Sequence, residues 1–260
     1  GGIVDGQTVR IRAIITDKAG NVTTGTESAS TIFIDQTKPV ILPLVVGWGA
    51  YLNAVEDNSN GTISVTTTGV EDGQTVTLNL NGTNYTNTIT ANATTITIPA
   101  LDLQKLAEGS HTITTNVSDA AGNAADPVTA DFIYDITPPT MVITATDGIA
   151  TAIVDGTTSS DVALTLTFTT NEPSLSFDAS DIDVTNGVLS NFIAVSNTVY
   201  TALFTPTTIG ATRIDVGVSK FTDLAENLNT AAAPTFDWTF TLTTAVVHVT
   251  CKDEADGTIT

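Results

Sequence analysis

Apolar and polar residues alternate along most of the chain, in short runs separated by turn-forming residues. Residues 76–80 form one such run, and residues 162–168 form another. A period of two places alternate side chains on one buried face, which is typical of half-buried β-strands. Only residues 101–106 fit a turn of helix. The pattern predicts an all-β protein, with further strands around residues 9–15, 30–35, 63–65, 96–98, 113–117, 132–134, 200–204, 214–218 and 236–240.

Turn signals separate these runs. Asn81-Gly82 and Asn186-Gly187 each carry the dipeptide that favours a two-residue β-hairpin. Residues 70–73, with the sequence Val-Glu-Asp-Gly, are expected to form another turn. Short strands joined by such turns are typical of a β-sandwich of about seven strands.

A five-residue motif that starts with Asp and ends with Asn occurs three times. The copies are residues 17–21, 119–123 and 223–227, with Ala at the third position in each. Their aspartates are 102 and 104 residues apart, about the length of one immunoglobulin-size sandwich. A period of this length indicates a tandem array of β-sandwiches rather than one enzyme fold.

The repeats divide the chain into four parts. Residues 1–38 are expected to hold only the last strands of a domain, residues 39–138 a complete domain and residues 139–244 a divergent one. Residues 245–260 have no counterpart and stay unassigned. The first two parts end in linkers, residues 34–39 and 134–139, whose prolines favour a short, stiff connection. Because the chain starts inside a repeat, we expect it to be a piece of a longer protein.

Composition narrows the class of partner. The net charge is −20, so a nucleic-acid backbone or an anionic membrane surface would be repelled. No apolar stretch is long enough to span a membrane. A single cysteine excludes an internal disulfide. The absence of disulfides from a multidomain β protein favours a bacterial surface protein, in which bound calcium can supply the stiffness that disulfides supply elsewhere.

Three segments resemble the Ig-like repeats of large calcium-rigidified surface adhesins of Gram-negative bacteria. They are residues 117–123, 134–139 and 177–187, and the resemblance extends over nearly all of residues 1–244. It implies tandem Ig-like domains that extend a terminal ligand-binding domain away from the cell, in adhesion and biofilm formation, often after type I secretion. The third unit departs from the repeat pattern at Glu226, where the family usually has Gly, and at Thr241, where the linker aspartate is missing.

Sandwich topology predicts which acidic residues meet. The entering linker lies at the same end as the loops after the second and sixth strands, so one group is expected to be Asp35, Glu71, Asp72 and Asp119. The corresponding group at the next linker is Asp135, Glu172 and Asp223, with Glu56 and Asp57 as possible contributors. Such a crowd of carboxylates repels itself unless a cation is present. Calcium accepts six to eight oxygen ligands, so the sequence predicts calcium sites.

One other interpretation of the motif stays open at this point. The Asp-to-Asn motif also fits a plain turn in which both side chains bond to their own backbone. In that turn, Asn21, Asn123 and Asn227 are expected to adopt a left-handed conformation rather than to bind metal. Asp178 and Asp181 are weaker candidates for a cation site.

No catalytic arrangement is found. The sequence lacks a nucleophile elbow, a phosphate loop and a paired His/Cys set. We therefore expect no enzyme, and the main hypothesis is an extracellular extender segment of an adhesin, with neighbouring repeats as its partners and any surface ligand held by another domain. The alternatives are a glycan- or peptide-binding module, in which Trp48 or Trp238 stacks on sugar, and accessory domains of a secreted hydrolase.

Overall fold

Short β-strands make up nearly all the regular structure. The computed structural model describes residues 2–242, so the unassigned tail of residues 245–260 lies outside the described residues. Within residues 2–242 the one α-helix, α1 (Ala100–Leu103), is a single turn, at the segment where the sequence predicts one. No helix in this part of the chain has the length and hydropathy needed to cross a membrane. The all-β prediction is confirmed.

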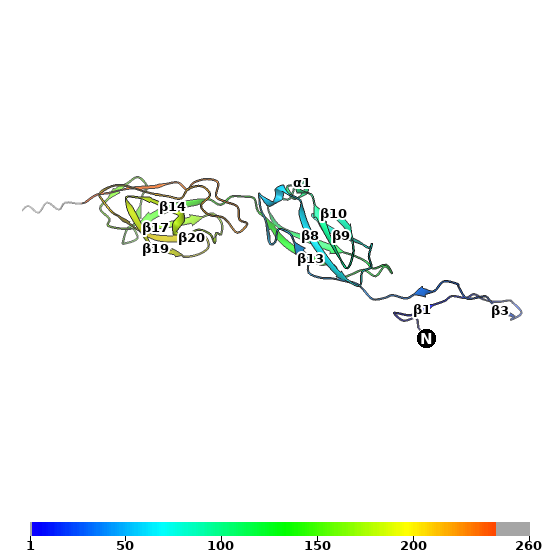
Figure 1. Cartoon of the computed structure of the whole chain (residues 1–260). Helices are drawn as coiled ribbons and strands as arrows, with labels where there is room; N and C mark the ends of the chain where they lie inside the picture. Colours follow the sequence, from blue (N-terminus) through cyan, green and yellow to red (C-terminus); the bar gives the residue numbers. More distant parts are fainter. Residues whose placement is uncertain (1, 243–260) are drawn as a thin grey trace, which may run out of the picture. The chain divides into compact units, whose positions relative to one another are not determined.

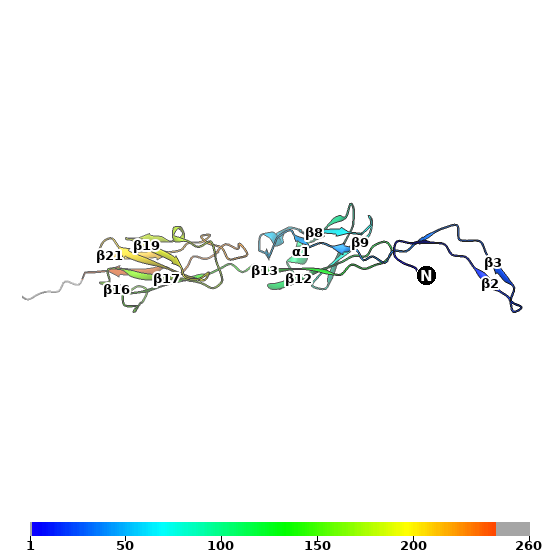
Figure 2. The same ribbon diagram turned by 90° about the horizontal axis from the view of Figure 1, so that it is seen from below.

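Contacts divide the chain into two compact units, Gly1–Thr137 and Pro138 onward. The first unit contains one complete β-sandwich, here called the first sandwich, in residues 39–137. Its larger sheet has the strand order β10 (Thr83–Thr88), β9 (Thr75–Leu80), β12 (Gly109–Asn116), β13 (Val128–Tyr134) and β7 (Tyr51–Leu52). Its smaller sheet consists of β11 (Ala93–Ile98), β8 (Gly61–Thr68) and β5 (Val40–Ile41), with β6 (Val45–Val46) also paired to β8. Figures 1 and 2 label several of these strands, among them β8, β9 and β13.

The core of the first sandwich lies between these sheets. Along β8, every second residue is buried, from Gly61 to Thr67, and the residues between them are exposed. Leu78 on β9 and Phe132 on β13 are also buried in this cluster. The alternation along the sequence is therefore the alternation between core and solvent, because successive strand residues point to opposite faces.

The second unit contains the second sandwich. Its larger sheet has the order β15 (Ala152–Ile153), β14 (Met141–Thr146), β17 (Leu164–Thr170), β20 (Val199–Pro206) and β19 (Gly187–Ala194). Its smaller sheet has the order β16 (Thr158–Ser159), β22 (Phe236–Phe240), β21 (Gly210–Asp215) and β18 (Asp183–Thr185). An aromatic cluster that includes Phe168, Phe204 and Trp238 fills the space between them.

Residues 2–38 form two short strand pairs and no closed core. β1 (Thr8–Val9) pairs with β4 (Ile32–Phe33), and β2 (Ile14–Thr16) pairs with β3 (Val22–Thr24). Most apolar side chains of this segment are exposed, which follows because two strands offer no second layer. The segment belongs to the same compact unit as the first sandwich, so a separate partial domain at residues 1–38 stays a prediction.

The two Asn-Gly signals have different outcomes. Asn81 and Gly82 have φ values of 49° and 82° and connect β9 to β10, so this hairpin is confirmed. The expected hairpin at Asn186-Gly187 is wrong, because β18 pairs with β21 in one sheet and β19 pairs with β20 in the other. The chain there crosses between sheets instead of folding back.

Asn186 explains why this crossover mimics a hairpin signal in the sequence. It adopts a φ of 56°, and its Nδ2 donates to the backbone oxygens of Thr208 and Ala211. Gly187 is needed for a different reason, since a Cβ there would lie 2.2 Å from the Phe204 ring. The hydrogen bonds of Asn186 and the close approach of Phe204 on the neighbouring strand β20, rather than a hairpin turn, account for this dipeptide.

Candidate functional site

The repeated Asp-to-Asn motif forms the same tight turn in each copy. In the first sandwich, Asn123 donates from its backbone N–H and from Nδ2 to the two carboxylate oxygens of Asp119, both at 2.8 Å. Asn227 makes the same two bonds to Asp223, at 2.9 and 3.0 Å, and Asn21 makes them to Asp17. The turn interpretation is therefore correct for the aspartates, whose carboxylates accept backbone bonds, but the asparagine side chains bond to the aspartate carboxylate and not to the backbone of the turn.

The left-handed residue of this turn is not the asparagine, so that prediction is wrong. It is the fourth residue of the motif, Gly20, Gly122 or Glu226, with φ values of 88°, 93° and 68°. The backbone N–H of Gly122 donates to the Asp119 backbone oxygen, and that of Glu226 donates to the Asp223 oxygen. The asparagines instead tie the end of the turn back to the aspartate.

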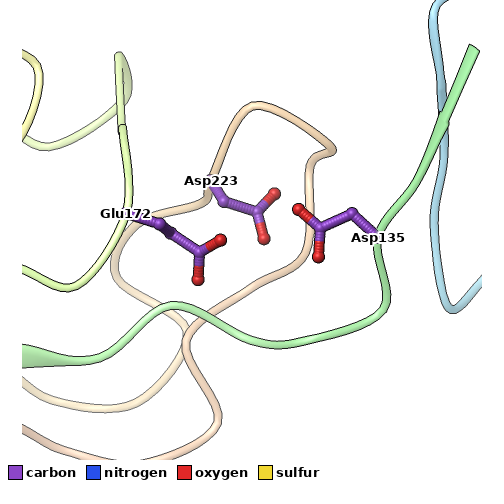
Figure 3. A group of neighbouring side chains, drawn as sticks. All are labelled: Asp135, Glu172 and Asp223. Atoms are coloured by element: carbon purple, nitrogen blue, oxygen red, sulfur yellow. The ribbon is translucent and has the colours of Figure 1, made fainter. Parts of the chain in front are cut away.

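Three acidic side chains meet at the turn of the second sandwich. Asp135, Glu172 and Asp223 each place a carboxylate oxygen so that the three oxygens lie within 4.8 Å of one another. Asp223 is buried and the other two are half-buried. Figure 3 shows the Asp135 and Asp223 carboxylates turned toward each other, with that of Glu172 beside Asp223. This is the arrangement that the sequence predicts for these three residues.

Each acid reaches this point from a different segment. Asp135 follows directly after β13, Glu172 lies two residues after β17, and Asp223 lies in the turn between β21 and β22. The backbone N–H of Thr137 donates to Asp135 Oδ1 at 3.2 Å. Asn171 Nδ2 donates to Glu172 Oε1 at 3.3 Å. Local hydrogen bonds thus help to hold all three carboxylates.

The donor set suits a hard divalent cation. Two oxygens that bind one calcium ion at about 2.3–2.6 Å are at most about 5 Å apart, and the separations here fall within that limit. Without a cation, each pair of ionised carboxylates at this spacing repels by on the order of a few kcal/mol. Carboxylate oxygens are the ligands that calcium prefers. The residues present fit calcium chemically.

The equivalent acids of the first sandwich surround the Asp119 turn in another way. Glu71 Oε2 accepts a bond from the backbone N–H of Ala120 at 2.8 Å. Asp35 contributes its backbone oxygen, to which Asn123 Nδ2 donates at 3.2 Å. Within residues 2–242, these carboxylates do not form a group whose oxygens all lie within 4.8 Å. The linker and both loops do meet around one turn, but the carboxylates are engaged separately.

Asp119 itself is buried and ionised at neutral pH. Burial raises the pKa of its carboxyl, but hydrogen bonds from the side chain and backbone of Asn123 and from the backbone of the turn outweigh burial, and the pKa lies below its ordinary value. The charge is stabilised by donors of its own loop.

Asp72 and Asp57 lie in other surroundings. Asp72 Oδ1 accepts a bond from the backbone N–H of Ala91 at 2.8 Å, so it braces the turn between β10 and β11. Asp57 is buried, and the Tyr134 hydroxyl donates to its Oδ2 at 2.7 Å. Burial, together with the Asp57 carboxylate, raises the pKa of Tyr134 to about 12. Neither aspartate joins the acidic group at Asp223.

Glu56, Asp178 and Asp181 are also used locally. Glu56 Oε2 accepts a bond from the backbone N–H of Asn53 at 3.3 Å. Asp178 and Asp181 form a reciprocal capping box around the 3₁₀ turn η2 (Ala179–Asp181). These carboxylates satisfy backbone donors that would otherwise lack partners at the start of a helical turn.

Sequence reasoning missed the function of two further acids, Asp5 and Glu108. Glu108 Oε1 accepts bonds from the Ile136 N–H and the Thr137 hydroxyl, and Asp5 makes the same kind of contact with the first linker. The signal was present, since Asp5-Gly6 and Glu108-Gly109 stand 11 to 12 residues before their Asp-to-Asn motifs. Spacing alone does not reveal a contact with the linker.

The two tryptophans do not form an exposed sugar-stacking surface. Trp238 is 1% exposed, and its Nε1 donates to Ser159 Oγ at 3.0 Å. Trp48 is half-buried and packs edge-on against Phe132, with ring centroids 5.2 Å apart. Both side chains are part of the packing of their own sandwiches.

A family model for the bacterial Ig-like domain matches residues 135–242. These residues are similar to the bacterial Ig-like domain. The match starts at Asp135, so the matched region includes the linker acid as well as Glu172 and Asp223. The unit that the sequence marks as divergent is thus the one that this model describes.

Several solved structures similar to the chain come from bacterial adhesins. A structure of a 1.5-MDa bacterial ice-binding adhesin is 19% identical, with a TM-score of 0.44 over 91% of this chain and 74% of that one. A structure of a Ca²⁺-stabilised adhesin that helps an Antarctic bacterium to bind ice is 19% identical, with a TM-score of 0.38 over 92% of this chain and 58% of that one. An Ig-like domain of the M. primoryensis ice-binding adhesin is 27% identical, with a TM-score of 0.29 over 37% of this chain and 96% of that one. No curated protein matches the chain in sequence.

Proposed function

We propose that this chain is an extender segment of a bacterial cell-surface adhesin, stiffened by calcium bound next to its second linker, residues 134–139. One observation carries the proposal: the oxygens of Asp135, Glu172 and Asp223 lie within 4.8 Å of one another, and Asp223 is buried. Burying a carboxylate beside two like charges is unfavourable without a compensating cation. The match of residues 135–242 to the bacterial Ig-like domain model supports an extracellular location and a structural, non-enzymatic role.

Calcium would act on the linker. A bound ion would supply positive charge shared by the three carboxylates, and Asp135 belongs to the linker that leads into the Ig-like domain. Holding Asp135 against two loops removes rotational freedom from the chain that enters the domain. Domain connections without such a restraint are usually mobile. The partners of each domain are then its neighbouring repeats. Any ligand on a host or environmental surface would be bound by another domain of the protein.

The linker sequence supports the same role. Pro138 and Pro139 follow Thr137 directly, and proline fixes its own φ and restricts the residue before it. At the first linker, Pro39 is buried, and Lys38 forms an ion pair with Asp126 at 2.7 Å. Short linkers with few free dihedral angles suit a spacer.

The test compares the chain with calcium and with chelator. If calcium is present at about 100 times its Kd, mass action stabilises the Ig-like domain by about 2.7 kcal/mol. That corresponds to a rise in Tm of roughly 10 °C or more for a domain of this size. Asp223→Ala and Asp135→Ala should abolish the rise. Glu27→Gln, a matched charge change at an exposed residue far along the chain, should leave it intact.

Small-angle scattering on the same samples tests the stiffening. We expect a larger maximum dimension and a narrower range of fitted conformations with calcium than with chelator. Scattering profiles and melting curves that are the same in both conditions would contradict the proposal.

A further inference from the structure

Glu108 ties the second linker to the first sandwich. Its Oε1 accepts two hydrogen bonds, from the backbone N–H of Ile136 at 3.0 Å and from the Thr137 hydroxyl at 2.7 Å. The backbone N–H of the same threonine donates to Asp135 Oδ1 at 3.2 Å. Thr137 therefore connects two carboxylates, with its hydroxyl on Glu108 and its N–H on Asp135.

The first linker shows the same arrangement. Asp5 accepts from the backbone N–H of Gln36 and from the Thr37 hydroxyl, both at 2.6 Å. The backbone N–H of Thr37 donates to Asp35 Oδ1 at 3.0 Å. A longer glutamate and a shorter aspartate thus make equivalent bonds at two linkers. Two different acids at equivalent positions make the same bonds, which indicates that the contact with the linker has a specific role.

The second sandwich lacks both acids of this arrangement. Gly109 begins β12 opposite Tyr134, with a φ of 123°, and Gly210 begins β21 opposite Phe240, with a φ of 130°. The residue before Gly210 is Ile209, which stands where Glu108 stands before Gly109. The residue after β22 is Thr241, where Asp135 follows β13. The acid before the glycine and the linker acid are present together twice and absent together once.

We propose that Glu108 is a positioning residue, which sets the Asp135 carboxylate toward Glu172 and Asp223 before any cation binds. Asp5 makes the equivalent bonds at the first linker, where the carboxylates do not converge. The inference rests on the proposed function, because Asp135 is a calcium ligand only in that proposal. The bonds to an ionised carboxylate are charge-assisted and therefore stronger than neutral ones. The Asp135–Thr137 bond fixes the aspartate side chain, and the Glu108–Thr137 bond fixes the threonine.

The physical benefit is preorganisation. A ligand that is already oriented loses less conformational freedom when an ion binds. Outer hydrogen-bond partners of metal ligands typically change metal affinity by about 10- to 100-fold. Glu108 is such a partner once removed, because it acts on Asp135 through Thr137.

The experiment uses the full chain and five variants, of which Asp223→Ala serves as the reference without the calcium site. Glu108→Ala removes both bonds, Glu108→Gln keeps an acceptor oxygen, Thr137→Val removes the hydroxyl, and Glu27→Gln is the charge control. Calorimetry with calcium follows the binding event that Asp223→Ala eliminates. Hydrogen exchange of the Ile136 amide, measured in chelator, reports the brace without any ion.

We expect Glu108→Ala to weaken that calcium affinity by about tenfold and to speed exchange of the Ile136 amide in chelator by a similar factor. Glu108→Gln should recover most of both losses, and Thr137→Val should weaken the affinity less than Glu108→Ala. Glu27→Gln should change neither quantity.

The outcomes separate this inference from the proposed function. If the wild-type chain binds no calcium at Asp223, the proposed function fails, and with it the ligand-positioning role of Glu108. If the wild type binds calcium and Glu108→Ala binds it equally well, the inference alone is overturned. An unchanged exchange rate at Ile136 in Glu108→Ala would also overturn it. A loss of Tm with unchanged calcium affinity would assign Glu108 a structural role only.

Discussion

The first and second sandwiches hold the same turn but surround it differently. Asp119 and Asp223 are both buried and both accept the same pair of bonds from the asparagine four residues later. Around Asp223, the oxygens of two more carboxylates come within 4.8 Å. Around Asp119, Glu71 bonds to the Ala120 N–H, and Asp35 bonds through its backbone oxygen.

This difference shows that a turn and a cation site are not competing interpretations of one motif. The turn uses lone pairs of the aspartate that face its own loop, and each carboxylate has about four acceptor directions. Whether further acids converge depends on the donors available to them. In the first sandwich, the Glu71 carboxylate accepts a bond from the backbone N–H of Ala120. In the second, the Glu172 carboxylate lies within 4.8 Å of the Asp223 carboxylate.

The largest expected effect comes from removing the turn aspartates. Asp119→Ala removes the acceptor of the half-buried Asn123 backbone N–H and one of the two acceptors of its Nδ2, and it should cost about 2–3 kcal/mol, equally in calcium and in chelator. Asp223→Ala loses the same bonds but also removes a like charge from the group with Asp135 and Glu172. Its cost should therefore be smaller in chelator and larger in calcium.

Each sandwich carries one tryptophan, which allows separate measurement. Trp48 lies in the first sandwich and Trp238 in the second, so 5-fluorotryptophan gives one ¹⁹F signal for each. Urea titrations followed by both signals would give the two free energies of unfolding. An Asp119→Ala cost that depends on calcium as strongly as the Asp223→Ala cost would remove the contrast between the two turns.

Acid should act on the first sandwich through Asp119. Because its folded pKa lies below the ordinary value, the carboxylate contributes stability that is fully present above the unfolded pKa of about 4 and is lost as pH falls through the folded pKa. This loss should be smaller than that of Asp119→Ala, because a protonated carboxyl still accepts hydrogen bonds. The Trp48 signal, followed in urea between pH 2 and 6, measures it.

Asp119→Asn is the matched variant for the acid experiment. It keeps an acceptor oxygen in the turn but cannot titrate, so part of the pH dependence below about pH 4 should disappear. A first sandwich whose acid sensitivity is the same with and without this substitution would show that other carboxylates control it.

Sequence patterns predicted these elements unequally. Strands such as β8 follow from alternation because one face is buried, and Asp135, Glu172 and Asp223 follow from strand order because loops at one end of a sandwich meet. Asp72 and Asp57 could not be placed, since their carboxylates bond to Ala91 N–H and to the Tyr134 hydroxyl. Such choices depend on which donor lies nearest after folding, and no spacing rule records that.

The Asp119 and Asp223 turns also differ in backbone strain at their left-handed residue. Gly122 adopts its left-handed φ without penalty, whereas Glu226 adopts a φ of 68° with a Cβ, at a cost of about 1 kcal/mol. Glu226→Gly should therefore stabilise the second sandwich by about 1 kcal/mol, and Gly122→Glu should destabilise the first by a similar amount. Urea unfolding followed by the two ¹⁹F signals checks both values.

Glu226→Gln separates strain from charge, because it keeps the Cβ and removes the negative charge near Asp223. If Glu226→Gln stabilises the second sandwich as much as Glu226→Gly, charge repulsion rather than the left-handed φ explains the effect. The expected result is that glycine gains clearly more than glutamine in calcium, where the acidic group is neutralised.

The smallest expected effect comes from breaking the Lys38–Asp126 ion pair, which is present at the first linker and has no equivalent at the residue after Thr137. Lys38 follows Thr37 and pairs with Asp126 at 2.7 Å, whereas Pro138 follows Thr137. Both partners of this ion pair are largely exposed, so Lys38→Ala should lower the stability of the first sandwich by no more than about 0.5 kcal/mol, and less in high salt. Urea titrations of Lys38→Ala, Asp126→Asn and the double variant give the coupling energy. A coupling above about 1 kcal/mol would mean that this ion pair holds the first linker as strongly as the bonds between Asp5 and Thr37 do. The first linker would then be restrained by an ion pair, where the second is restrained by Pro138.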